Sequence, residues 1–196
     1  MKTNNTQNQT KTTSEDRRIR RTKKLLKNAL MELTLEKGYD EVNVQEIIDR
    51  ADVGRTSFYT HFRSKEDLLL QNLDDLQNIF EPAPSENTDA SKTQDFSLMM
   101  FLHLKENWRL AKVLLGNKKI PIVRNYVQNI LVKYYKKKFQ EEYAKTKSPM
   151  EIEGAAVFTS GALISLTLWW LSMDKPATPE KMHEMFISLV KEKQQR

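Results

Sequence analysis

Apolar residues recur with the period of an α-helix along most of this chain. The clearest stripe lies in residues 26–33, where leucine and alanine occupy positions i, i+3, i+4 and i+7. This spacing predicts a helix from about Asp16 to Glu36, with Gly38 as the residue that ends it. Residues 1–13 are polar almost throughout, and we expect them to form a disordered arm.

The next segment predicts two short helices joined by a tight turn. Asn43 stands three residues before Glu46, which is the spacing of a capping box, and residues 44–51 have one apolar face. Asp52 falls in the turn, where aspartate tolerates the left-handed backbone conformation better than most residues do. The second helix then covers about Arg55 to Phe62, and its two phenylalanines are one turn apart and should face inward.

Further helices follow to the end of the chain. Ser64 caps a helix that continues to about Phe80, and Ser148 and Thr178 each precede a proline, which suits the first helical position. Beyond residue 93 the spacing predicts helices over roughly 94–106, 108–116, 121–145, 149–173 and 179–193. The predicted fold class is therefore all-α, with about nine helices.

The best boundary lies at residues 81–93, where prolines, serines and asparagines interrupt the helical pattern. We expect the following parts: a disordered arm over 1–15, a helix-turn-helix domain over 16–65, a connecting helix over 66–80, a loop over 81–93, and a regulatory and dimerisation domain over 94–196.

The composition excludes several kinds of site. The chain has 196 residues and no cysteine, so it has no disulfide framework, no thiol nucleophile and no cysteine-ligated zinc. We find no glycine-rich phosphate loop, no Gly-x-Ser-x-Gly elbow and no cluster of metal-ligating side chains, so we expect no enzyme activity and no cofactor. Glu180 and His183 form an i, i+3 pair, but two ligands are a weak metal signal. The polar N-terminal segment lacks the features of a signal sequence, which favours a cytoplasmic location.

The positive charge is concentrated in the N-terminal third. The whole chain carries a net charge of +6, and residues 1–65 hold 14 Lys/Arg against 9 Asp/Glu, a net charge of +5. A basic segment that also holds a helix-turn-helix pattern is typical of a protein that binds nucleic acid. We therefore expect double-stranded DNA as a partner, with the helix over 55–62 as the recognition helix in the major groove.

One motif in this segment resembles a known family. Residues 51–69 read ADVGRTSFYTHFRSKEDLL, and within them the pattern Phe-Tyr-x-x-Phe-x-x-Lys begins at Phe58. This stretch resembles the signature of TetR-family transcriptional regulators, and the resemblance covers roughly residues 20–70. Two residues depart from the signature. Gly54 stands where the family often has Ser or Asn, and Asp52 stands where it frequently has Gly.

The residues expected to contact DNA come from four places, namely the recognition helix, the helix start at Lys65, the basic run over 17–27 and the helix cap at Asn43. Arg55 is expected to read guanine or to bind phosphate, the hydroxyls of the recognition helix are expected to reach phosphate or base edges, and Lys65 is expected to bind a phosphate at the next helix start. Seven basic residues and no acid occupy residues 17–27, which indicates either phosphate or minor-groove contact or a solvated helix face. The candidate DNA-binding residues are Arg55, Thr56, Ser57, Tyr59, Thr60, His61, Lys65, Asn43, Arg17, Arg18 and Arg20. For Tyr59 the alternative is ordinary packing, and for Arg55 a solvated charge.

The C-terminal half contains an unusually apolar helix. Residues 155–173 carry no charge, which approaches the length of a membrane span. Its serines, threonines and capped start favour a buried helix instead, in part against a second subunit, so we expect no membrane partner. Segments at residues 161–163, 169–171 and 179–182 resemble one C-terminal class of TetR-like regulators. That resemblance implies a homodimer through the last two helices and a ligand pocket between the loop and the dimer face.

The pocket residues are candidates only, because aromatic residues and methionine at helical spacing more often form a core. They are Phe96, Met100, His103, Trp108, Tyr126, Tyr134 and Phe158. Together these features predict a sequence-specific transcriptional regulator, a ligand-responsive repressor that binds a palindromic operator as a dimer in response to an unknown small-molecule effector. The alternative is a TetR-like coactivator or interaction module that needs a partner protein.

Overall fold

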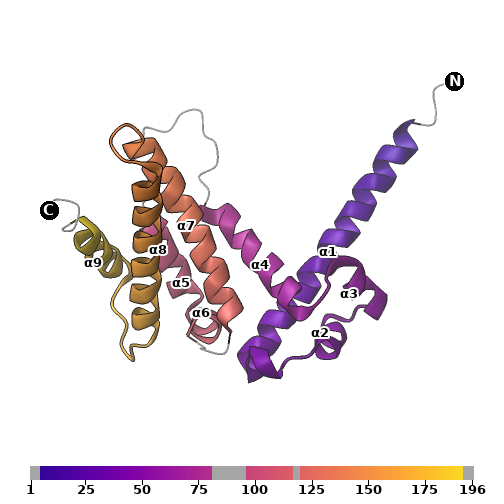
Figure 1. Ribbon diagram of the computed structural model, residues 1–196. Helices are drawn as coiled ribbons and strands as arrows, with labels where there is room; N and C mark the ends of the chain where they lie inside the picture. Colours follow the sequence, from indigo (N-terminus) through magenta and orange to yellow (C-terminus); the bar gives the residue numbers. More distant parts are fainter. Residues whose placement is uncertain (1–4, 81–95, 117–119, 192–196) are drawn as a thin grey trace. The chain divides into compact units, whose positions relative to one another are not determined.

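The computed structural model describes residues 5–80, 96–116 and 120–191, and within them every regular element is helical (Figure 1). This confirms the predicted all-α class. The elements are α1 (Asn5–Lys37), the 3-10 helix η1 (Tyr39–Glu41), α2 (Val44–Ala51), α3 (Arg55–His61), α4 (Lys65–Phe80), α5 (Phe96–Glu106), α6 (Trp108–Leu114), α7 (Pro121–Tyr143), α8 (Pro149–Leu171) and α9 (Pro179–Lys191).

The chain divides into two compact units, Met1–Asp74 and Asp75–Arg196. The division falls inside α4, so this helix begins in the N-terminal unit and ends in the C-terminal one. The expected loop over residues 81–93 lies outside the described residues.

α1 begins much earlier than the sequence pattern predicts. Residues 5–15, which we expected to be a disordered arm, belong to the first turns of this helix, so that prediction was wrong for them. The physical reason is that extending an existing helix fixes one residue for each hydrogen bond gained, whereas only the first turn is costly to form. The packed segment further along α1 supplies the nucleus, since Leu26 and Leu30 are fully buried.

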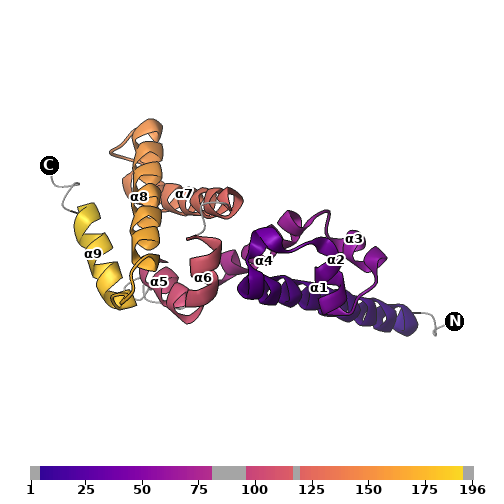
Figure 2. The ribbon, with the colours of Figure 1, turned by 90° about the horizontal axis from the view of Figure 1, so that it is seen from below.

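The N-terminal unit packs α2 and α3 against the C-terminal half of α1 (Figure 2). Its fully buried apolar side chains are Leu26, Leu30, Ile47, Phe58, Leu68 and Leu69. Gly38 ends α1 with φ 89°, a value that favours glycine, and its N–H donates to the Thr34 carbonyl at 3.0 Å. The predicted end of the first helix is thereby confirmed.

Lys65 ties the start of α4 to η1. Its ammonium donates to the carbonyl oxygens of Val42 at 2.7 Å, Tyr39 at 3.0 Å and Asp40 at 3.4 Å. It also lies 4.5 Å from the centre of the Tyr39 ring, whose hydroxyl donates to Glu66. All three ammonium protons therefore have acceptors inside the protein.

The C-terminal unit is built around α8, and α7 packs against it (Figure 1). Trp170 on α8 is fully buried, and its ring meets those of Trp108 at 4.9 Å and Phe101 at 5.3 Å, both edge to face. Its indole N–H donates to the Ala177 carbonyl at 2.9 Å, which satisfies the polar atom and holds the α8–α9 connection.

Among the described residues, α8 is the one helix long and apolar enough to cross a membrane by length and composition. A core helix passes the same test, and α8 has the predicted soluble-type start. The Ser148 side chain accepts from the Glu151 N–H at 3.3 Å, and Glu151 accepts in return from the Ser148 N–H at 2.8 Å. Ile152, Ala156, Leu163 and other residues of α8 are buried in the core of the C-terminal unit.

Lys65→Met should destabilise the protein, because it keeps most of the side-chain volume but leaves the partly buried carbonyls of Tyr39 and Val42 without this donor. We expect the free energy of unfolding in urea to fall by about 1–3 kcal/mol. Lys24→Met is the matched control, since Lys24 is exposed on α1. Equal stability of the two variants would show that the Lys65 contacts add nothing.

Candidate nucleic-acid interface

Residues close together in the sequence determine where α2 starts and how the chain turns into α3. Asn43 caps α2 by accepting from the Glu46 N–H at 3.0 Å, and the Glu46 carboxylate accepts from the Asn43 N–H at 2.9 Å, so the predicted capping box is confirmed. Asp52 adopts φ 50° and ψ 52°, the left-handed conformation expected of it. The chain then reverses and α3 begins after Gly54, which provides no side-chain cap.

The two faces of α3 have opposite character. Phe58 and Phe62 are buried, with ring centres 5.9 Å apart, whereas Tyr59 next to them keeps 52% of its surface exposed. Arg55, Thr56 and Thr60 are exposed too, and Ser57 and His61 are half-buried at the edges. The predicted inward and outward faces of this helix are confirmed.

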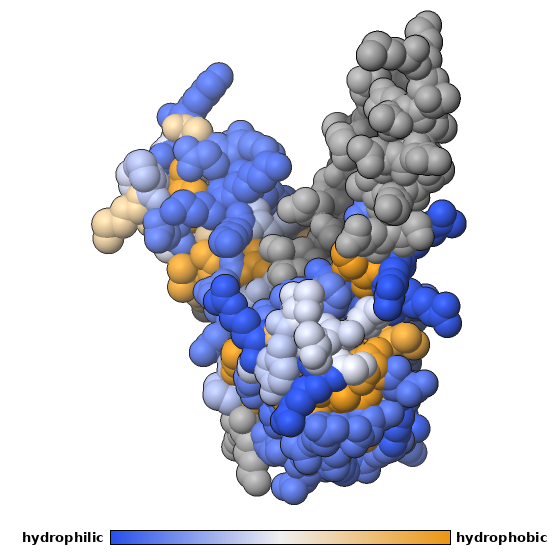
Figure 3. Space-filling model, turned by 90° about the vertical axis from the view of Figure 1, so that its right-hand side faces the viewer, coloured by the Kyte–Doolittle hydropathy of each residue, from blue (hydrophilic) through white to orange (hydrophobic). Residues whose placement is uncertain are grey.

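The exposed face of α3 is suited to hydrogen bonding. The Thr60 hydroxyl donates to the Thr56 carbonyl at 2.8 Å, which leaves its oxygen free to accept. Figure 3 views the side of the N-terminal unit that α3 occupies, and this surface is mostly blue and pale with smaller apolar patches. A short helix with guanidinium, hydroxyl and phenol groups outward matches the way a recognition helix meets base edges and phosphates.

Two residues predicted to contact DNA, Lys65 and Asn43, make hydrogen bonds within the N-terminal unit. The Lys65 ammonium is directed at three carbonyl oxygens of residues 39–42, and the Asn43 side chain caps α2. Lys65 is half-buried and makes these three contacts within the N-terminal unit, and its role as a phosphate ligand stays a prediction. The Asn43 amide group retains donors for an outside partner.

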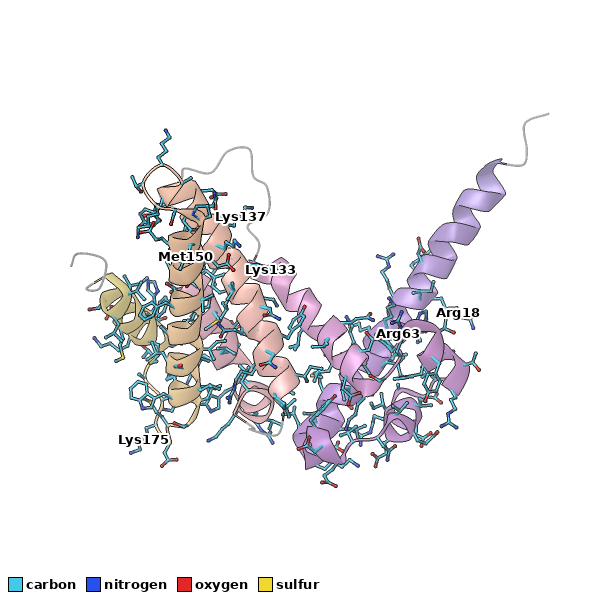
Figure 4. The ribbon with its side chains drawn as sticks, in the orientation of Figure 1. Arg18, Arg63, Lys133, Lys137, Met150 and Lys175 are labelled. Atoms are coloured by element: carbon cyan, nitrogen blue, oxygen red, sulfur yellow. The ribbon has the colours of Figure 1, made fainter. Side chains whose placement is uncertain are left out.

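The basic run lies on α1. Arg17, Arg18 and Arg20 are exposed, and the Arg20 side chain makes a 3.4 Å contact with the Asp16 carbonyl. Arg63, which we did not select from the sequence, is also exposed, between α3 and α4; Figure 4 labels it together with Arg18. Arg63 lies inside the Phe-Tyr-x-x-Phe-x-x-Lys pattern, and this position could have identified it as a candidate DNA contact.

Other cations of the N-terminal unit are paired on a different part of its surface. Arg50 on α2 contacts Glu36 of α1 at 2.8 Å and Glu32 at 3.4 Å, and Lys37 pairs with Glu46. The Arg50 hydrogen bond is the main cause that lowers the pKa of Glu36. These pairs join α1 to α2.

His61 lies at the end of α3 in a partly apolar setting. Its ring is 6.4 Å from that of Phe62, and Lys23 lies 6.0 Å from the Phe62 ring centre. Burial lowers the His61 pKa, and the positive charge of Lys23 lowers it further. The neutral imidazole is therefore the favoured form at pH 7, and it has a hydrogen-bond donor and an acceptor.

The predicted pocket residues fall into two groups. Phe96 and Met100 are buried, and Phe96 stacks on the ring of Tyr134 at 4.3 Å. His103, Trp108, Tyr126 and Tyr134 are half-buried on α5, α6 and α7. Burial lowers the pKa of His103. These six side chains stay candidates for an interior ligand site.

Phe158 does not belong with them, and its assignment to the pocket was wrong. It lies on the outer face of α8 with 50% of its surface exposed. The helical spacing alone did not reveal which face of this uncharged helix meets the core. Phe158 instead lines a groove of about 390 Å³ between α8 and α9, together with Ala162, Ser165, Leu166, Trp169, Phe186, Leu189 and Val190.

The histidine at the end of the recognition helix gives a pH prediction. Because the folded pKa of His61 lies below its ordinary value of 6.5, the unfolded chain binds a proton first as the pH falls. The free energy of unfolding should therefore decrease between pH 7.5 and pH 5.5, and decrease less in His61→Gln. Urea unfolding at both pH values tests this, and an identical loss in wild type and variant would contradict it. His103→Gln is a parallel variant, since burial shifts its pKa in the same direction.

Comparison with known proteins agrees with this geometry. The profile for bacterial regulatory proteins of the tetR family matches residues 26–71, which include α2, α3 and the turn between them. A second profile, described as a transcriptional regulator C-terminal region, matches residues 91–192. A solved structure of a TetR transcriptional regulator from Streptococcus agalactiae is similar with a TM-score of 0.68 and 25% identity, covering 91% of this chain and 98% of that one.

Two curated relatives extend the comparison. The chain is 24% identical over 180 residues to the uncharacterized HTH-type transcriptional regulator YxbF of Bacillus subtilis, covering 89% of this chain and 46% of YxbF. It is 28% identical over 86 residues to DhaS of Lactococcus lactis, the HTH-type dhaKLM operon transcriptional activator, covering 44% of each. The chain thus spans less than half the length of these curated relatives. With both profiles matched in order, one on each unit, the chain belongs to the TetR family of bacterial transcriptional regulators.

Proposed function

We propose that this protein is a ligand-responsive repressor that binds a near-palindromic operator as a homodimer in the cytoplasm. The observation that carries the proposal is the division of α3 into a buried aromatic face and an exposed face with Arg55, Thr56, Tyr59 and Thr60. Buried aromatics fix the rotation of the helix, so its polar side chains are presented to DNA without reordering. Arg55 supplies a fork for guanine or phosphate, and the hydroxyls supply contacts to the backbone or base edges.

The exposed arginines at 17, 18 and 20 on α1, together with Arg63, add contacts to phosphate in this proposal. Residues 16–65 act as the DNA-binding domain, residues 66–80 as the connecting helix, and residues 94–196 as the regulatory and dimerisation domain. Lys65 and Asn43 support the interface by holding η1 and α2 in place.

The groove between α8 and α9 is the proposed dimer face. Phe158, Trp169 and Leu189 keep 50%, 49% and 54% of their surfaces exposed around it, and no charged residue lines it. Large apolar side chains that stay exposed to water are unfavourable. When two copies meet about a two-fold axis, each copy covers the groove of the other. Gly154 and Gly161, on the same helix, have open space where a Cβ would stand, which permits close approach.

The effector site is proposed in the interior of the C-terminal unit, among Phe96, Met100, His103 and the neighbouring aromatic side chains. An apolar or aromatic small molecule suits this lining, with His103 and tyrosine hydroxyls as polar partners. Binding there favours a form in which the two recognition helices of the dimer no longer match the operator. The coupling is reciprocal, so DNA weakens effector binding by the same factor, typically about 5–150-fold.

A second candidate function is a regulator that activates with the help of a partner protein. The likeness to DhaS, which is named an operon activator, favours the activating part of this candidate. Both candidates use the same DNA-binding surface. They differ in whether the purified protein alone selects an operator.

Selection of binding sites from a random duplex DNA pool tests the proposed function. We expect the purified protein to recover a palindrome whose half-site centres are about 34–36 Å apart, or a multiple of that spacing, as for a two-fold dimer. Leu189→Glu, which places a charge in the groove, should recover no palindrome, whereas Leu102→Glu on α5 is the control, since Leu102 is exposed outside the groove. DNA with no common sequence from the wild type would reject the proposal and favour the partner-dependent candidate.

Replacing Arg17, Arg18 and Arg20 together with alanine should flatten the salt dependence of operator binding. Each lost phosphate contact lowers the slope of log K against log salt by about 0.9, and a homodimer carries the three substitutions twice, so we expect a decrease of up to about 5. Lys133→Ala with Lys137→Ala removes two exposed charges from α7 (Figure 4) and should leave the slope unchanged. An unchanged slope in the triple variant would remove these arginines from the interface.

A further inference from the structure

A polar contact buried in the C-terminal unit joins α5 to α9. The Ser97 Oγ atom on α5 lies 2.8 Å from the His183 Nδ1 atom on α9, although the two residues are 86 positions apart in the chain. Ser97 is completely buried and His183 is half-buried. A hydroxyl removed from water in this way makes its hydrogen bond within the protein, and losing the partner is more costly than the bond itself is favourable.

On α9, His183 lies on the same side as two residues of the groove. Phe186 and Val190 follow it at i+3 and i+7, and both line the groove between α8 and α9. Phe186 is also part of the core of the C-terminal unit. A bond that fixes His183 therefore fixes the rotation of α9 about its axis, and with it the place of Phe186 and Val190 in the groove wall.

On α5, Ser97 lies beside the interior aromatic residues. Phe96 precedes it and stacks on Tyr134 of α7 at 4.3 Å, with the Tyr135 ring 6.4 Å away and edge-on. Met100, one turn further along α5, is buried in the same core. In the first turn of α5, Phe96 thus contacts the interior aromatic residues and Ser97 contacts α9.

We infer that Ser97 and His183 are positioning residues that set the orientation of α9, and so join the interior aromatic residues to the groove in which a second copy docks. This inference rests on the proposed dimer. A displacement of Phe96 moves Ser97, the bond carries that movement to His183, and the groove side chains on α9 change place. The pair acts on dimer affinity without contacting the second copy.

Dimer dissociation constants of the full chain, measured by sedimentation equilibrium, test the inference. Ser97→Ala should raise the dissociation constant about tenfold, which corresponds to the net loss of about one buried hydrogen bond. Ser160→Ala is the matched control. Ser160 is also completely buried, but its hydroxyl donates to the Ala156 carbonyl of its own helix at 2.6 Å, so its loss should change the constant less than threefold.

Two substitutions of His183 separate the bond from general packing. His183→Asn keeps a hydrogen-bonding group near the position of Nδ1 and should stay within about threefold of wild type, whereas His183→Leu should match Ser97→Ala. Combining Ser97→Ala with His183→Leu should weaken the dimer by less than the sum of the two single effects, because both substitutions remove the Ser97–His183 interaction. If Ser97→Ala fails to fold, the two His183 variants carry the test, with circular dichroism reporting that they are folded.

The outcomes separate the inference from the proposed function. A wild type that remains monomeric removes the proposed dimer, and the inference with it. A dimeric wild type with equal dissociation constants in Ser97→Ala and Ser160→Ala overturns the inference alone, as do additive effects in the double variant.

Discussion

The C-terminal unit depends on one helix having two different surroundings. α8 carries no charge from residue 155 to its end, so none of its sides is strongly preferred by water. The core takes the side with Leu163 and Trp170, and the edge-to-face contacts of Trp170 with Phe101 and Trp108 hold α5 and α6 in place. The opposite side, with Phe158 and Trp169, is left for a further apolar surface. The same uncharged composition thus serves the core on one side of α8 and, in the proposed dimer, the contact with a second copy on the other.

The N-terminal unit is specified differently, by polar groups that satisfy backbone atoms. The Asn43–Glu46 capping box starts α2, the left-handed Asp52 ends it, and the Lys65 ammonium binds carbonyl oxygens of the 3-10 helix. Each contact is modest alone, but together they leave few alternatives for the path of the chain. The recognition helix is short, with seven residues, so it depends on this frame and on two buried phenylalanines for its position.

Features set by neighbouring residues could be predicted from the sequence. Contacts between distant residues, and the face that an uncharged helix buries, could not. Helix starts at Asn43 and Ser148 follow from residues three positions apart, and the inward face of Phe58 and Phe62 follows from helical period. The outer position of Phe158 did not follow, because an uncharged helix gives no period from which to choose a face. Lys65 was likewise unpredictable, since its acceptors lie 23 to 26 residues earlier and come together only in the fold.

The division of α3 also bears on how such a protein diverges. Phe58 and Phe62 carry the burial of this helix, whereas Arg55, Thr56, Tyr59 and Thr60 are solvent-exposed and their packing contributes little to stability. Substitutions at exposed positions usually change stability by less than about 0.5 kcal/mol, so they draw little on the small margin that keeps a protein folded. If these side chains contact the operator as proposed, a copy that arises by gene duplication can acquire a new operator preference in single steps, each of which leaves a folded regulator.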